Sequence, residues 1–190
     1  MKVLLHICCA NCLIYPFRVL KTEGREIKGF FYNPNIHPYQ EYIKRKECLK
    51  NYAQMIDLPM IWGKDYELEK FIQAVVFREH KRCEICYYLR LEETAKVAKE
   101  NNFDAFTTTL LYSKYQKFDS IIEIGCSLGE KYNLMFLEKD FREGWKEGIQ
   151  ESKRLGLYRQ QYCGCIYSEK ERYMRKEAKK WEPLNGSVNL

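Results

Sequence analysis

Short apolar runs recur along the chain and alternate with longer segments whose apolar residues follow helical spacing. The runs are rich in β-branched and aromatic residues, as buried strands are. The second run ends at the breaker cluster Asn33-Pro34-Asn35, which stops a strand. We predict five strands, over residues 2–7, 26–33, 58–63, 104–111 and 133–138.

The intervening segments predict helices. Phe141, Trp145 and Ile149 recur every four residues before Gly156 and would form one buried helix face. Because proline favours a first helical turn and glycine a helix end, we expect the first helix to run from Pro16 to Gly24. The predicted helices cover residues 16–24, 39–56, 66–77, 82–102, 118–132, 141–156 and 169–181.

Strands that alternate with helices predict an α/β fold with a Rossmann-like parallel sheet flanked by helices. The chain shows no repeat, low-complexity tract or linker, so we expect one domain over residues 1–190, with a frayed tail at 183–190. Ligands of such folds lie at the carboxyl ends of the strands. That rule gathers residues 8–12, 33–39 and 107–113, and the loop after residue 138, on one rim.

The composition is that of a globular protein, with 46% hydrophobic and 31% charged residues and a net charge of +6. This charge permits a polyanionic partner but does not require one. The apolar run before His6 is shorter than the core of a secretory leader, so a buried first strand is the better interpretation. We therefore expect a cytoplasmic protein with no membrane partner.

Nine cysteines are the most unusual feature of the composition. They stand at positions 8, 9, 12, 48, 83, 86, 126, 163 and 165. An odd count at this density argues against a disulfide scaffold, and the clustering favours metal or redox chemistry. No glycine lies between Leu4 and Gly24, so the first turn lacks the usual phosphate cradle and carries cysteines instead.

Two cysteine groups are predicted at element boundaries. Cys83 and Cys86 stand three residues apart at a helix start, where both thiolates can reach one metal. Together with thiols from the group at residues 8–12 they would form a tetrathiolate site for an iron–sulfur cluster or zinc. Adjacent cysteines favour the cluster, although zinc stays open.

Cys163 and Cys165 flank Gly164 and would form a redox-active pair or a second metal site. Cys12 fits either group. We expect the other cysteines, Cys48 and Cys126, to be core residues. Of the three histidines, His6 is expected in the core, whereas a ligand or catalytic role is open for the loop residues His37 and His80.

Four long segments resemble one known family. They span residues 6–12, 31–42, 82–116 and 141–168. They resemble the cobalamin-independent epoxyqueuosine reductases, the QueH family, and the likeness runs from about residue 3 to residue 168. Asn11 departs from the family pattern, in which we expect proline, and we expect no chemical consequence.

The resemblance implies a HUP-type Rossmann-like fold and an oxidoreductase. Such enzymes reduce the epoxide of epoxyqueuosine, at the anticodon wobble position of tRNA, to queuosine and water. The resemblance also implies a [4Fe–4S] cluster on Cys8, Cys9, Cys83 and Cys86, and a redox-active pair, Cys163 and Cys165. It leaves open an additional mononuclear iron with Cys12 among its ligands, and the electron donor is unidentified.

Basic and aromatic residues alternate next to the last cysteine pair. Arg154, Tyr158, Arg159 and Tyr162 would grip phosphates and stack on anticodon bases, with His37 as a further contact; a solvated helix end is the alternative. Two competing functions remain. An iron–sulfur tRNA thiolase would need a glycine-rich first turn, which is absent, and a zinc-stabilised RNA-binding module would be colourless.

Overall fold

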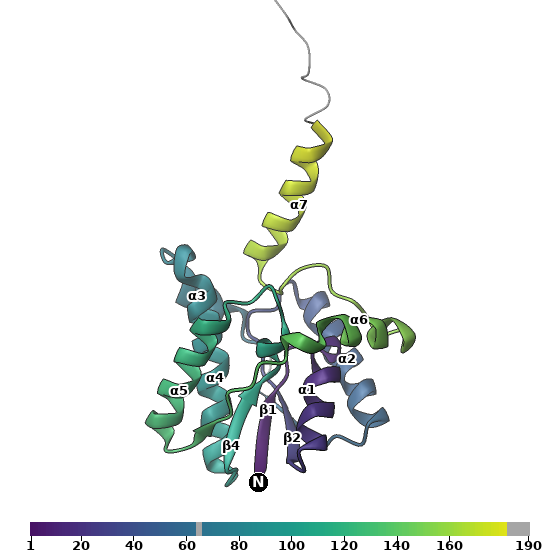
Figure 1. Ribbon diagram of the computed structural model, residues 1–190. Helices are drawn as coiled ribbons and strands as arrows, with labels where there is room; N and C mark the ends of the chain where they lie inside the picture. Colours follow the sequence, from purple (N-terminus) through teal and green to yellow (C-terminus); the bar gives the residue numbers. More distant parts are fainter. Residues whose placement is uncertain (64–65, 182–190) are drawn as a thin grey trace, which may run out of the picture.

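A five-stranded parallel sheet forms the centre of the computed structural model, which describes residues 1–63 and 66–181, with side chains as far as Arg175. Its order is β3-β2-β1-β4-β5 (Figure 1). The strands are β1 (Lys2–His6), β2 (Glu26–Phe31), β3 (Met60–Trp62), β4 (Ala105–Thr108) and β5 (Met135–Phe136). All neighbouring strands pair in parallel, so the predicted Rossmann-like α/β class is confirmed.

Helices flank the sheet in two groups (Figure 1). One group packs around α1 (Ala10–Thr22) and contains α2 (Tyr39–Met55) and α6 (Trp145–Arg154). The other packs around α4 (Arg82–Glu100) and contains α3 (Leu68–Val75) and α5 (Phe118–Tyr132). The last helix, α7 (Ile166–Trp181), extends away from the sheet. Short 3-10 turns cover Glu79–Lys81, Thr109–Tyr112 and Arg142–Gly144.

The central strand explains why the first apolar run does not alternate with polar residues. Val3, Leu4 and Leu5 are all fully buried, because β1 lies between β2 and β4 and both of its faces are covered. The predicted rim follows from this arrangement. The carboxyl ends of β1, β2 and β4 lie side by side, and the loops that leave them carry the candidate chemistry.

Two boundaries differ from the prediction. The first helix begins at Ala10, six residues before Pro16, which lies inside it. Cys12, Leu13 and Ile14 are buried against the core, and this packing outweighs the backbone hydrogen bond that the proline cannot donate. The fourth strand ends at Thr108, whose hydroxyl accepts the Leu110 amide at 3.1 Å and starts a 3-10 turn.

The remaining strands and helices lie within a few residues of their predicted positions, and the helix over 118–132 matches its predicted bounds. The frayed tail expected at 183–190 falls outside the described residues. Across residues 1–63 and 66–181, none of the helices has the length and apolar character needed to cross a membrane.

A close approach between α5 and β5 depends on a glycine. A Cβ atom added to Gly129 would lie 2.8 Å from the carbonyl oxygen of Leu134, and the Leu134 amide donates to the Gly129 carbonyl at 2.9 Å. Both contacts are with backbone, which cannot move aside as a flexible side chain can. The glycine therefore sets the distance between helix and sheet.

We expect Gly129→Ala to lower the free energy of unfolding by about 1–2 kcal/mol, since overpacking costs more than the helix gains from alanine. Urea unfolding followed by circular dichroism measures this. Ser127→Ala, at an exposed position of the same helix, serves as the control and should leave the midpoint unchanged or slightly raised. A Gly129→Ala midpoint at or above the wild-type value would contradict the packing argument.

Candidate metal and redox centre

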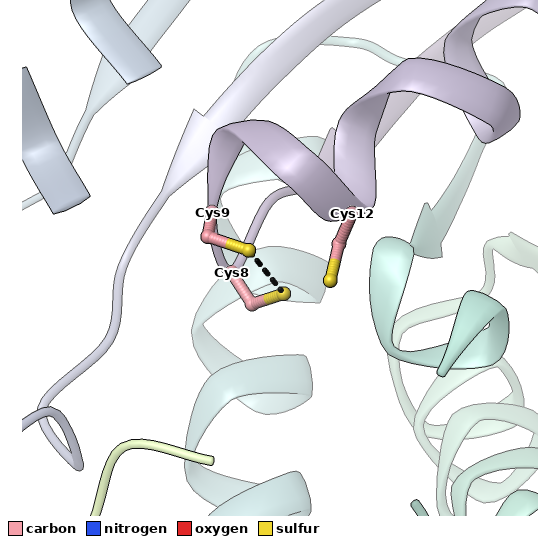
Figure 2. Close-up of side chains that lie close together, drawn as sticks. All are labelled: Cys8, Cys9 and Cys12. Carbon is pink, nitrogen blue, oxygen red and sulfur yellow. Dashed lines mark hydrogen bonds between the residues drawn. The ribbon is translucent and has the colours of Figure 1, made fainter. Parts of the chain in front are cut away.

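Three cysteines meet where β1 passes into α1. Their sulfur atoms all lie within 4.8 Å of one another and point toward a common position (Figure 2). The Sγ atoms of Cys8 and Cys9 are 3.8 Å apart, and Cys12 reaches them from the first turn of α1. In the part of the chain that the structure describes, no other group of three or more potential metal ligands is this close.

The polar side chains next to this cysteine triad are buried and hydrogen-bonded. His6 has no exposed surface; its Nδ1 lies 2.8 Å from the Thr108 hydroxyl and its Nε2 3.1 Å from the Tyr32 carbonyl. Burial, reinforced by the positive charge of Arg90, lowers the pKa of His6 to about 3. His6 is therefore a neutral core histidine, as predicted. Next to it, Thr109 accepts the Cys8 amide at 3.1 Å and donates to the Cys8 sulfur at 3.4 Å.

A second thiol group surrounds the start of α4. Cys86 is buried in a small apolar cluster with Cys165, Phe71 and Val75, and Cys83 is half-buried next to it. Burial, together with the neighbouring Cys163 and Cys165 thiols, raises the pKa of Cys86 to about 12 against the opposing charge of Arg90. Burial raises the pKa of Cys83 too, with contributions from the same two neighbours. Thus Cys83 and Cys86 share their surroundings with the last cysteine pair.

A buried ion pair on α2 holds the segment that carries Cys163 and Cys165. Arg45 Nε donates to Glu41 Oε1 at 2.7 Å, and both side chains are buried. The same guanidinium donates to the carbonyls of Cys163 at 2.7 Å and Tyr162 at 3.1 Å, and the Tyr158 hydroxyl donates to the other Glu41 oxygen. Residues 158–165 are therefore held across the carboxyl edge of the sheet.

The same segment reaches back to the triad. The Asn11 amide donates to the Tyr158 carbonyl and to Gln160 Oε1, both at 2.8 Å. Gln160 Nε2 in turn donates to the Cys9 sulfur at 2.9 Å. Asn11 thus has structural contacts that proline could not make, since proline has no side-chain amide, while the expectation of no chemical consequence stays a prediction.

The two cysteines of the last pair differ in exposure. Cys163 is exposed, and its sulfur accepts from Gln116 Nε2 at 3.2 Å, while Cys165 is buried. Gln116 is oriented by the Tyr87 hydroxyl, which donates to Gln116 Oε1 at 2.9 Å. Between the pair, Gly164 has φ +152°, a value that favours glycine, and its carbonyl accepts the His37 amide at 2.8 Å.

A second buried arginine lies between the thiol groups. Arg90 is one turn beyond Cys86 on α4 and is 2% exposed. Burial by itself would lower the pKa of Arg90, but the thiols of Cys86, Cys163 and Cys8 raise it above its ordinary value. The rim thus combines cysteines from three segments with two buried guanidinium groups.

The predicted substrate-contacting residues fall in different environments. The His37 ring is buried; Nε2 donates to the Pro34 carbonyl at 3.1 Å and Nδ1 accepts the Ile166 amide at 3.4 Å. Tyr162 donates its hydroxyl to the His37 carbonyl. Arg159 is exposed, and Arg154 is exposed and paired with Glu151 at 2.6 Å. His80 is also exposed, away from the cysteine triad.

The structure brings together Cys8, Cys9 and Cys12 more closely than the predicted set of Cys8, Cys9, Cys83 and Cys86. That four-cysteine set stays a prediction. Sequence reasoning also missed the polar residues Glu41, Arg45, Arg90, Gln116 and Gln160. A signal existed for two of them, because Arg45 and Arg90 stand four residues after Glu41 and Cys86 and so share their helix faces.

A parallel sheet with a thiol-rich carboxyl edge defines an α/β protein with a metal or redox centre. A family model described as epoxyqueuosine reductase QueH matches residues 3–171. The chain is 41% identical over 179 residues to the epoxyqueuosine reductase QueH of Thermotoga maritima, covering 90% of this chain and 91% of that protein. It is 34% identical over 172 residues to that of Dehalococcoides mccartyi, covering 90% and 94%. The chain belongs to the epoxyqueuosine reductase QueH family and is an oxidoreductase.

The fold has a more distant relative among solved structures. A crystal structure from Methanocaldococcus jannaschii, described as a predicted subunit of tRNA methyltransferase, superposes with a TM-score of 0.52 at 16% identity. The match covers 80% of this chain and 74% of that one. At this identity the likeness concerns the fold alone, and it agrees with the predicted Rossmann-like α/β class.

Proposed function

We propose that this protein removes the epoxide oxygen of epoxyqueuosine in tRNA with a thiol-held iron–sulfur cluster and a cysteine pair. Removing the oxygen leaves an alkene and one water, which requires two electrons and two protons. The observation that carries the proposal is the gathering of seven of the nine cysteines around the carboxyl edge of the sheet. Neither Cys48 nor Cys126 belongs to this group.

The donor set fits an iron–sulfur cluster in two respects. Soft thiolates are the ligands that iron–sulfur clusters and zinc select. A thiolate-held cluster is also negatively charged, and the buried guanidinium groups of Arg45 and Arg90 lie next to the thiols that would hold it. We assign Cys8, Cys9, Cys83 and Cys86 to a [4Fe–4S] cluster and leave Cys12 for an additional mononuclear iron. Once bound, these groups would supply single electrons and Lewis-acid character.

The cysteine pair can supply both electrons and both protons of one turnover. Oxidation of the Cys163 and Cys165 thiols to a disulfide releases two electrons and two protons, which convert the epoxide to an alkene and water. Their arrangement supports this role, because Cys163 is exposed to an incoming substrate and Cys165 is buried next to Cys86. The Gln116 amide donates to the Cys163 sulfur and orients it. An electron donor, as yet unidentified, would reduce the disulfide again.

The tRNA would approach across residues 154–162. Arg159 and Arg154 present exposed positive charge there, and the Tyr158 and Tyr162 rings are partly exposed beside them. Phosphate contacts fix the position of a nucleic acid, and aromatic rings stack on splayed bases. His37 would act indirectly, by supporting the Tyr162 hydroxyl and the Gly164 turn.

The first prediction concerns the cluster ligands. We expect Cys83→Ser/Cys86→Ser, reconstituted anaerobically, to lose the brown colour, most of its iron and sulfide, and all conversion of epoxyqueuosine in tRNA. Cys126→Ser, the control, removes a thiol outside the rim group, next to Glu138, and should keep all three. A Cys83→Ser/Cys86→Ser protein with full sulfide content and activity would refute the ligand assignment. A colourless wild-type protein that contains zinc would favour the RNA-binding alternative.

The second prediction separates the cysteine pair from the cluster. We expect Cys163→Ser and Cys165→Ser each to keep the acid-labile sulfide of the wild type but to lose conversion of epoxyqueuosine to queuosine. In a single turnover without an external donor, the wild-type chain should yield a 163–165 disulfide, detected by mass spectrometry after alkylation. Full activity in the double variant, or a turnover that leaves both thiols reduced, would remove the pair from the mechanism.

The third prediction tests the tRNA surface. We expect Arg154→Gln/Arg159→Gln to weaken tRNA binding and to reduce the slope of log affinity against log salt by about 1 for each lost phosphate contact. The control is Arg25→Gln, which removes a charge at the opposite edge of the sheet, before β2. An unchanged slope in the double variant, with affinity intact, would mean that tRNA binds elsewhere.

A further inference from the structure

Arg90 is a buried cation that has no carboxylate partner among the described residues. Its Nε donates to the Cys86 carbonyl at 3.3 Å and its Nη1 to Asn33 Oδ1 at 3.3 Å. Its Nη2 is buried and has no hydrogen-bond partner among the described residues. Arginine is almost always paired when it is buried, because an isolated charge in the interior is costly.

A count of the buried carboxylates and basic side chains identifies Arg90 as the charge that has no opposite charge beside it among the described residues. Among residues with described side chains, the buried carboxylates and basic side chains that are charged at neutral pH are Glu41, Arg45 and Arg90. Glu41 is committed to Arg45 at 2.7 Å. One positive charge is therefore left over, and it belongs to Arg90.

The surroundings of Arg90 indicate what anion would balance it. Asn33, which accepts from Arg90, donates its amide to the Ile7 carbonyl at 2.9 Å, directly before Cys8. On the other side, the arginine contacts the backbone of Cys86. The guanidinium thus connects the backbones that carry the two thiol groups assigned to the cluster.

We propose that Arg90 is the buried counter-charge of the iron–sulfur cluster and sets its reduction potential. The inference rests on the proposed function, because it needs the cluster to be present. A fixed positive charge in a low-dielectric interior stabilises the more negative, reduced cluster. Arg90 therefore makes the cluster easier to reduce, and it acts through the cluster without touching the substrate.

The test compares the reduction potentials of anaerobically reconstituted full-length variants, titrated with a dye-mediated reductant and followed by EPR. At the wild-type midpoint, we expect Arg90→Met to show at least a tenfold lower ratio of reduced to oxidised cluster, which is about 59 mV for one electron. Arg90→Lys keeps the charge and should stay close to the wild type. Arg82→Met removes a more exposed charge next to Cys83 and should shift the ratio far less, because solvent screens it.

If Arg90→Met does not load a cluster, Arg90→Gln and Arg90→Lys decide the question, since only the lysine keeps the charge. A midpoint of Arg90→Met or Arg90→Gln equal to that of the wild type would overturn the inference, as would equal shifts in Arg90→Gln and Arg90→Lys. A wild-type protein that gives no cluster signal would instead overturn the proposed function, and the inference with it. The two failures are therefore distinguishable.

Discussion

The Glu41–Arg45 ion pair is the interaction on which the organisation of the rim depends. It lies on α2, far in sequence from the segment that it holds. Arg45 donates to the carbonyls of Tyr162 and Cys163, and Glu41 accepts the Tyr158 hydroxyl. Arg45 is the residue of α2 whose hydrogen bonds reach the carbonyls of Tyr162 and Cys163. Buried pairs of this kind contribute less to net stability than to conformational specificity, and removing one partner costs about 3–5 kcal/mol.

These hydrogen bonds explain how cysteines from segments distant in sequence lie close to one another. Parallel strands bring the turn after β1 and the loop after β2 to the same edge, but the last cysteine pair follows α6 and has no strand to position it. Two anchors replace the strand. The Arg45 guanidinium holds the segment from α2, and the Asn11 and Gln160 amides attach it to the first turn of α1.

The sequence predicts the layers of this fold and much less of the site. Apolar runs and helical spacing identify all five strands, and the signature is most continuous in β1 and β4, where burial on both faces requires it. The start of α1 was predicted too late, since Pro16 is a strong local signal that packing of Leu13 and Ile14 overrides. The spacing of the cysteines identifies them as candidate site residues from the sequence. The spacing of Arg90, four residues after Cys86, indicates a shared helix face, but only the three-dimensional structure reveals that Arg90 is buried, because a helical arginine is usually solvated.

The thiol groups and the arginines form one electrostatic system. Hydrogen bonds from Cys12 and Cys8 lower the pKa of the Cys9 thiol, whereas burial raises the pKa values of the Cys83 and Cys86 thiols. Two guanidinium groups offset this by favouring negative charge at the same place, and only one of them is neutralised by a carboxylate. No carboxylate among the described residues balances the remaining charge. On the proposed function, thiolates bound to the cluster would balance it, and we therefore expect assembly of the cluster and order of the rim to occur together.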